Sequence, residues 1–469
     1  MTIPAPKSVA IIGAGPVGLA AAAHALERGL NPIVLEAGPE AGHAVRQWSH
    51  VRMFSPWEYN IDKAAQRLLA ATGWNVPDPQ AYPTGGDLIA HYIEPLSTRT
   101  ALKDRIKTSA RVTAMSRVGF DKVKSKGREA APFEIRYRNG KGPEKLRADA
   151  VIDASGTWFS PNPSGANGLP AVGEPELAKR LAYGMPDVLG IDRDRYANKT
   201  VAVLGAGHSA IGTLIDFVRL KDEEAGTTVI WLLRGDSPQK AFGGGANDKL
   251  SARGELGSTF ARLVSDGRLQ VETNFGVTHV TEAGARLRIG AGSSCCGKHA
   301  VVDELIVSTG FRPDLSMLSE LRLGLDPALD CPKILAPLID PNEHSCGTVR
   351  PHGARELAHP EPGFYIAGMK AYGRAPTFLT LTGYEQVRSI VADIAGDKKA
   401  AARVELVLPE TGVCSRAPLS EADACCGGPA KSDASACCVS DETAKAAGQS
   451  GCGCEPEEPQ KAKASSCCG

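Results

Sequence analysis

The stretch "SVAIIGAGPVGLAAAAHALERGLNPIVLEAG", residues 8–38, decides the fold. It opens with a short apolar, β-branched run, which a glycine-rich turn and an alanine-rich run follow. A second apolar run, "NPIVLEAG", comes directly after them. Because β-branched runs favour strands and the longer alanine-rich run favours a helix, these residues predict a strand, a helix and a second strand. Such a β-α-β unit indicates a parallel sheet and therefore an α/β protein.

The turn inside this unit has the glycine pattern of a dinucleotide site, Gly-x-Gly-x-x-Gly. Gly13 permits the tight turn, Gly15 lets the backbone approach a diphosphate, and Gly18 lets the helix pack closely on the strand. The diphosphate would lie at the positive N-terminus of the helix. Glu36 ends the second strand, where its carboxylate can accept hydrogen bonds from a ribose. The predicted contacts of this site are Gly13, Gly15, Pro16, Gly18 and Glu36.

A second copy of the pattern begins at residue 200, with "TVAVLGAGHSAIGTLIDFVRL" followed by "TTVIWLLRGD". Alanine takes the place of the third glycine, and Arg234 rather than an acid ends the following strand. A guanidinium suits the 2′-phosphate of NADPH, whereas the neighbouring Asp236 leaves NADH open. We therefore favour an NADPH site here. Its predicted contacts are Gly205, Gly207, His208, Ser209, Ala210 and Arg234.

Two dinucleotide sites in one chain indicate that one holds a flavin and that the other receives the nicotinamide nucleotide that reduces it. The segments Ser155-Gly156 and Thr309-Gly310 resemble the crossover strands of two-dinucleotide flavoproteins, and the resemblance covers about residues 8–395. It implies FAD and NADPH as cofactors. It also implies two Rossmann-like three-layer domains, of which the FAD domain is split by an inserted NADPH domain. The expected limits are 1–195 and 306–405 for the two parts of the FAD domain and 196–305 for the NADPH domain.

The same resemblance implies further residues around the flavin. The segment "WSHVRMFSPWEYN", residues 48–60, is similar to a flavin-lining segment of the flavin monooxygenases. The segment "FYIAGMK" is similar to a late strand that closes over the flavin, with Gly368 in place but Met369 where an aspartate is usual. The helix after it would direct N–H groups towards the flavin. The implied contacts are Arg46, Trp48, Val112, Ser155, Gly156, Thr309, Gly310, Gly368, Thr382 and Gly383.

The cysteine positions and the order of the motifs leave three candidate functions for such a flavoprotein. A disulfide reductase with a cysteine pair beside the flavin is excluded, because residues 1–294 contain no cysteine. The motif order is similar to that of the flavin monooxygenases, although their FxGxxxH segment is missing. "VRMFSPWEYNID", "GFYIAGMKAYGRAPTF" and the cysteine-rich end resemble a monooxygenase-like group associated with arsenic resistance. We rank metalloid-linked oxidation first, a tail-mediated reductase of metals or disulfides second, and a non-catalytic sequestering flavoprotein third.

The C-terminal segment 411–469 is predicted to be a disordered, cysteine-rich tail. Nine of the 13 cysteines lie after residue 413, and no aromatic residue follows Tyr384. Adjacent cysteines have Cα atoms about 3.8 Å apart, closer than the roughly 4.4–6.8 Å of most disulfides. Such pairs stay available for a soft ion, for which a trivalent metalloid or mercury is the expectation. The predicted ligands are Cys425, Cys426, Cys437, Cys438, Cys452, Cys454, Cys467 and Cys468.

Charge and hydropathy limit the kinds of partner and the cellular location that we expect for this protein. Lysine plus arginine and aspartate plus glutamate both number 53, so the charge gives no reason to expect nucleic acid or an anionic membrane. No stretch approaches the roughly 18 apolar residues of a transmembrane helix, and clustered thiols favour a reducing, cytoplasmic compartment. We expect a small-molecule or metalloid substrate, for example a trivalent arsenic species. The catalytic residues and a homodimer stay open.

Overall fold

The computed structural model describes residues 6–243, 250–292, 297–342, 349–376 and 378–406. The chain divides into two compact units, Met1–Ser415 and Arg416–Gly469, and every described residue belongs to the first. The predicted tail and the eight cysteines that are predicted to bind metal therefore lie outside the described residues.

The first β-α-β unit forms the centre of a parallel five-stranded sheet with the strand order β16-β7-β1-β2-β3. The strands are β1 (Ser8–Ile12), β2 (Asn31–Leu35), β3 (Ile106–Lys107), β7 (Ala150–Asp153) and β16 (Phe364–Ile366). β1 pairs with β2 on one side and with β7 on the other. The carboxyl ends of these parallel strands meet at one edge, where open α/β sheets bind their ligands.

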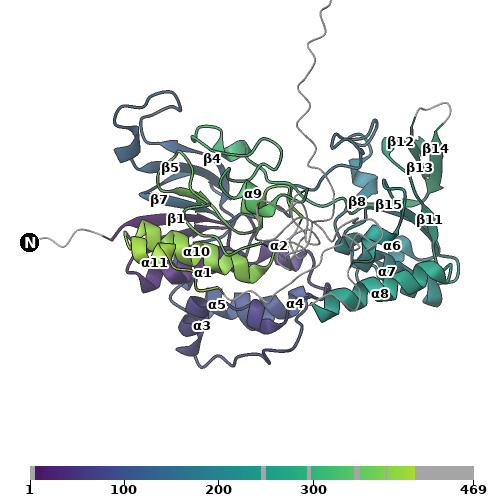
Figure 1. Ribbon diagram of the computed structural model, residues 1–469, viewed down its shortest axis with the longest axis horizontal. Coiled ribbons are helices and arrows are strands. Elements are labelled where there is room, and N and C mark those ends of the chain that lie inside the picture. The colour runs from purple at the N-terminus through teal and green to yellow at the C-terminus, as the bar shows by residue number, and fades with distance from the viewer. Residues whose placement is uncertain (1–5, 244–249, 293–296, 343–348, 377, 407–469) are drawn as a thin grey trace, which may run out of the picture. The chain divides into compact units, whose positions relative to one another are not determined.

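Helix α1 (Pro16–Glu27) connects β1 to β2 and is buried along most of its length. It packs against α10 (Thr380–Ile394) and α3 (Lys63–Ala70), which lie with it below the first sheet in Figure 1. Its alanine side chains, Ala20 to Ala23, are fully buried, because small residues let sheet and helices approach closely.

The second β-α-β unit forms another parallel five-stranded sheet, in the order β11-β10-β9-β15-β8. The strands are β8 (Leu181–Tyr183), β9 (Thr200–Leu204), β10 (Thr228–Leu232), β11 (Gln270–Glu272) and β15 (Glu304–Val307). Helix α7 (His208–Glu223) follows β9 and packs on α8 (Ser251–Ser265). β8 lies within residues 1–195, the range predicted for the first part of the FAD domain, yet it forms an edge strand of the second sheet. The domain limits stay predictions.

Alternate residues of β9 show that the second sheet is covered on both faces. Val201 and Val203 belong to a core with α7 and α8, whereas Ala202 and Leu204 belong to a core with the β12-β13-β14 sheet. A strand buried on both faces is typical of a parallel sheet. Together with the first sheet, this confirms the predicted α/β fold with two Rossmann-like domains.

Two antiparallel three-stranded sheets and several short helices complete the described fold. The sheets comprise β4 (Arg111–Arg117), β5 (Phe133–Asn139) and β6 (Gly142–Ala148), and β12 (Val277–Ala283), β13 (Arg286–Ala291) and β14 (Lys298–Val302). The helices are α2 (His43–Arg46), α4 (Gly85–Leu88), α5 (Glu94–Arg99), α6 (Arg193–Tyr196), α9 (Ala336–Ile339) and α11 (Lys398–Ala402). Across the described residues, every helix is too short or too polar to span a membrane.

Candidate functional site

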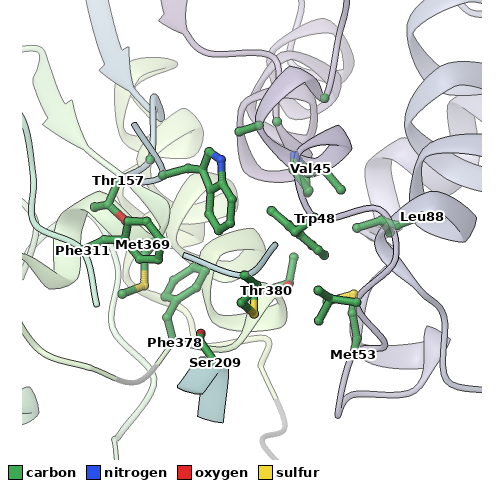
Figure 2. Close-up of a pocket in the computed structure, with 18 of the residues that line it drawn as sticks. Val45, Trp48, Met53, Leu88, Thr157, Ser209, Phe311, Met369, Phe378 and Thr380 are labelled. Atoms are coloured by element: carbon green, nitrogen blue, oxygen red, sulfur yellow. The ribbon is translucent and has the colours of Figure 1, made fainter. Parts of the chain in front are cut away.

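The first glycine turn and the start of α7, which follows the second glycine turn, line one cavity with a volume of about 1140 Å³. Figure 2 shows Trp48 and Met53 on one side of it, and Phe311 and Met369 on the other. Eleven of the predicted cofactor residues line it, namely Gly13, Gly15, Pro16, Glu36, Trp48, Val112, Ser155, Gly156, His208, Ser209 and Gly368. Residues far apart in the sequence thus come together at the carboxyl ends of both sheets.

The first glycine turn leaves its backbone open to the cavity. Gly13 has φ +97°, and a Cβ there would lie 2.8 Å from the carbonyl oxygen of Ala154. A Cβ on Gly18 would lie 1.9 Å from the carbonyl oxygen of Gly13, whereas one on Gly15 would meet nothing within 4 Å. Gly13 and Gly18 are therefore required by packing, and the free space at Gly15 fits the approach of a diphosphate.

The Glu36 carboxylate is held beside this turn. The backbone N–H groups of Ala14 and Gly38 each donate a hydrogen bond to it, both 2.7 Å long. Glu36 is buried, yet it lines the cavity. Because an ionised carboxylate can accept about four hydrogen bonds, it can still accept from ribose hydroxyls.

The second glycine turn meets the cavity through the first residues of α7. Gly205 has φ +139°, and a Cβ there would lie 2.2 Å from the carbonyl oxygen of Ser308. His208 and Ser209 line the cavity, and the His208 ring lies 5.1 Å from the ring of Phe54 in the first domain. A Cβ on Gly207 would meet nothing within 4 Å, as at Gly15, but Gly207 itself does not line the cavity.

The strand end after β16 is held by a buried chain of hydrogen bonds. The N–H of Gly368 donates to the Gln386 side-chain oxygen at 2.7 Å, and the Gln386 nitrogen lies 2.8 Å from Nε2 of His352. Burial lowers the pKa of His352, so the neutral ring that this chain needs is favoured. Gly368 has φ +72°, which favours glycine at this turn.

Sequence reasoning missed a buried ion pair at the cavity wall. The Lys370 ammonium lies 2.7 Å from Oδ2 of Asp153 and 3.1 Å from Oγ of Ser155, which itself donates to Asp153. Lys370 is 1% exposed and Asp153 is fully buried. The available signal was the lysine directly after Met369, in a segment that is otherwise apolar.

Apolar and aromatic side chains make up much of the remaining wall. Trp158 stacks on Phe311 with the ring centroids 4.9 Å apart. Four methionines line the cavity, and their flexible thioethers adapt to different ligand shapes. The lining apolar side chains include Trp48, Met53, Phe54, Trp158, Met185, Phe311, Met317, Met369 and Phe378.

The wall formed by α7 and α8 carries charged groups. Asp216, Arg219 and Glu255 line it, and Nη1 of Arg219 lies 3.4 Å from Oδ1 of Asp216. Burial raises the pKa of Asp216, although Arg219 and His50 act in the opposite direction. This end of the cavity can therefore hold polar parts of a ligand.

The other ten predicted contacts do not line the cavity. They are Gly18, Arg46, Gly205, Gly207, Ala210, Arg234, Thr309, Gly310, Thr382 and Gly383. Arg46 pairs with Glu40 at 2.8 Å, and Nη1 of Arg234 donates to a main-chain carbonyl at 3.0 Å. Gly383 packs against the start of α1. Cofactor contacts stay predictions at these ten residues, as they do at the eleven that line the cavity.

None of the described residues that line the cavity is a cysteine. Cys331 is fully buried away from the cavity, and burial raises the pKa of its thiol to about 12. Within the described residues, no group of three histidines, cysteines or acids is placed to hold a metal ion. The paired cysteines at 295–296, like Cys346, lie outside these residues.

Comparison with solved structures identifies the fold. The bacillithiol disulfide reductase Bdr (YpdA) from Bacillus cereus matches with a TM-score of 0.60 and 22% identity, over 83% of this chain and 99% of that one. DfoA, the cadaverine monooxygenase of the desferrioxamine pathway from Erwinia amylovora, matches with a TM-score of 0.56 and 14% identity, over 86% and 98%.

Sequence comparison places the chain in a family. The flavin-containing monooxygenase FMO GS-OX-like 2 of Arabidopsis thaliana is 20% identical over an alignment of 241 residues that covers 46% of this chain and 48% of that protein. The chain thus spans about half the length of this curated relative. The family model of the pyridine nucleotide-disulphide oxidoreductases matches residues 10–331. The chain therefore belongs to the pyridine nucleotide-disulphide oxidoreductase family.

Proposed function

We propose that this protein is an NADPH-dependent FAD oxidoreductase that acts as a flavin monooxygenase. The observation that carries the proposal is the cavity that the first glycine turn and the residues directly after the second one, His208 and Ser209, both line. FAD and NADPH are its cofactors. A bound flavin supplies two-electron chemistry, because it accepts a hydride from a reduced nicotinamide and passes the electrons on to oxygen or to a substrate.

The residues of the chain bind and orient these groups. The turn at Gly13 and Gly15 and the N-terminus of α1 would hold the FAD diphosphate, and Glu36 would hold the ribose. His208 and Ser209 would face the nicotinamide nucleotide, and Arg234 its 2′-phosphate. The predicted domain limits and the remaining predicted contacts form part of this proposal.

The described wall of the cavity favours an oxidative reaction. Its aromatic and thioether side chains offer water few hydrogen-bond partners, and the exclusion of water from the reacting groups would protect a reactive oxygen species from side reactions. A reductase with cysteines beside the flavin would need thiols here, and the described lining residues include none. Electrons are therefore expected to leave towards oxygen.

For the substrate, we propose a small molecule or a trivalent arsenic species in a cytoplasmic detoxification role. The support comes from the sequence, since four closely spaced cysteine pairs lie within residues 425–468. Thiolates select soft centres, and repetition raises their local concentration. In this scheme the tail captures the metalloid for the enzyme.

A second candidate is a reductase that uses the tail cysteines as its electron acceptor, and a third is a sequestering flavoprotein without turnover. Full-length protein and a variant that ends at residue 406 separate the three candidates. NADPH consumption and oxygen uptake are measured with and without methylarsenite, in air and under argon.

Each candidate gives a different result in this experiment. A monooxygenase shows oxygen uptake that saturating methylarsenite raises and that the truncation leaves intact. A tail-dependent reductase consumes NADPH under argon and loses turnover on truncation. Sequestration shows stoichiometric binding of methylarsenite with background NADPH oxidation, and that result would contradict the proposed activity.

A further inference from the structure

We propose that Lys370 is a positioning residue that donates a charge-assisted hydrogen bond to the diphosphate of bound FAD. This inference rests on the proposed function and assigns a residue that the glycine pattern does not contain. It starts from the ion pair at the cavity wall, where Lys370 and Asp153 are nearly without solvent contact.

Two of the three N–H groups of the Lys370 ammonium have an acceptor among the described residues. An ammonium has three donors. Asp153 accepts one at 2.7 Å and the hydroxyl of Ser155 accepts another at 3.1 Å. Among the described residues no acceptor is found for the third, and Lys370 lines the cavity. Because a buried N–H without a partner is costly, a ligand atom in the cavity is its natural acceptor.

The ammonium lies next to the turn that would hold the diphosphate. A Cβ on Gly13 would lie 2.9 Å from Cα of Ser155, so the residue that contacts Lys370 abuts the glycine turn. A Cβ on Gly368, two residues before Lys370, would lie 3.4 Å from the side chain of Val17 in the first turn of α1. The lysine therefore lies close to the N-terminus of α1, where the helix dipole also favours an anion.

The field of the ammonium reaches the cavity. Hydrogen bonds from Ser316 lower the pKa of Asp314, and Lys370 lowers it further. Asp314 also lines the cavity. With Asp153 fixing its position and balancing its charge, the ammonium can donate to a phosphate oxygen that is bound beside it in the cavity. A negatively charged diphosphate fits this group better than a neutral part of the flavin does.

Replacement of both charges by amides tests the proposal. The variant Lys370→Gln/Asp153→Asn keeps a hydrogen-bonded pair but has no ammonium, and it leaves no unpaired buried charge. The matched control Lys398→Gln/Asp393→Asn makes the same change in an ion pair of 2.7 Å whose lysine is 74% exposed. Flavin-free full-length proteins are titrated with FAD, and quenching of the flavin fluorescence gives the dissociation constant.

We expect the Lys370→Gln/Asp153→Asn variant to bind FAD roughly tenfold to a hundredfold more weakly than wild type, as for the loss of a charged hydrogen bond. The control should bind like wild type. The variant Lys370→Met/Asp153→Asn, which has an apolar side chain of similar length, serves if the amide pair fails to fold. FAD binding by the folded variant within twofold of wild type would overturn the proposal. If wild-type protein itself fails to bind FAD, the proposed function fails instead.

Discussion

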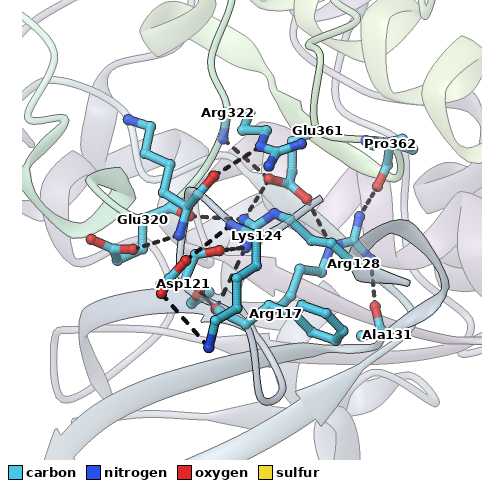
Figure 3. A network of polar contacts seen from close by, with 12 residues as sticks. Arg117, Asp121, Lys124, Arg128, Ala131, Glu320, Arg322, Glu361 and Pro362 are labelled. Carbon is cyan, nitrogen blue, oxygen red and sulfur yellow. Dashed lines mark hydrogen bonds and ion pairs between the residues drawn. The ribbon is translucent and has the colours of Figure 1, made fainter. Parts of the chain in front are cut away.

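The exchange of Glu361 for glutamine should cost the protein a large part of its stability. Glu361 is 1% exposed and accepts hydrogen bonds from Nε of Arg117 at 2.7 Å and from Nη2 of Arg128 at 2.8 Å. The N–H of Arg322 donates to the same carboxylate at 3.1 Å. Figure 3 shows these groups around the carboxylate, with other arginine donors directed at main-chain carbonyls such as that of Ala131. The network ties the β4-β5-β6 sheet to the segment before β16.

The expected cost follows from the burial of the two guanidinium groups. Glu361→Gln keeps the shape but leaves both arginines without an opposite charge. Removal of one partner from a buried ion pair costs about 3–5 kcal/mol. Unfolding entropy of about 2.1 cal/mol/K per residue over roughly 400 residues gives about 0.8 kcal/mol/K, so the melting temperature should fall by roughly 4–6 °C.

The pH dependence gives this prediction a second readout. Burial alone would raise the pKa of Glu361, but hydrogen bonds from Arg128 and Arg117 outweigh burial and lower it below 4.5. A carboxyl with a lowered pKa contributes stability above its unfolded-state pKa and loses it as the pH falls through the folded-state value. The wild type should therefore lose stability below about pH 4.5 more steeply than the variant does.

Thermal unfolding followed by circular dichroism measures both effects. The matched control is Glu223→Gln, which breaks a surface pair with Arg193, and Glu223 is 56% exposed. Surface pairs contribute about 0–1 kcal/mol, so its melting temperature should stay within about 1 °C of wild type. A Glu361→Gln protein that melts like this control would refute the argument that the carboxylate balances two buried cations.

Three further predictions follow from single residues. Gly13→Ala should abolish FAD retention, since a Cβ would lie 2.8 Å from the carbonyl oxygen of Ala154; flavin absorbance of the purified variant checks this. Cys331 should resist iodoacetamide in the folded protein and react after unfolding, because its thiol has a pKa near 12 and is buried; peptide mass mapping measures the difference. Burial lowers the pKa of His359 to about 4 from 6.5, so its contribution to stability is present above pH 6.5 and is lost as the pH falls towards 4. His359→Gln should flatten the stability profile in that window by roughly 3 kcal/mol, as measured by urea unfolding at several pH values.

The sequence predicted those parts of the fold and the site that depend on neighbouring residues. A glycine turn between a strand and a helix is a local feature, so Gly13, Gly15 and Glu36 could be found from their spacing alone. The same holds for His208 and Ser209, which follow from the second copy. The place of each turn at the carboxyl edge of its own sheet could also be expected, because parallel strands end at one edge.

The rest depends on contacts between distant residues, which spacing does not contain. Asp153 and Lys370 are 217 positions apart, yet their charged atoms lie 2.7 Å from each other. Arg234 makes another contact that spacing does not contain, because its guanidinium donates to the carbonyl of Ala166; the phosphate contact expected from its position at a strand end stays a prediction. The course of the loop after β10 determines where the Arg234 side chain lies, and secondary-structure propensities do not predict the course of a loop.

The two crossover segments explain how the domains share one cavity. The chain leaves the first sheet after β7 and returns to it after β15, and Asn162 joins the two passages. Its N–H donates to the carbonyl of Gly310 at 2.9 Å, and its side-chain nitrogen donates to the carbonyl of Thr309 at 3.0 Å. The Thr309 hydroxyl donates back to the carbonyl of Asn162 at 3.0 Å. Because three hydrogen bonds hold the passages together, the glycine turns on either side keep their spacing. Electron transfer between two bound nucleotides would require that fixed spacing.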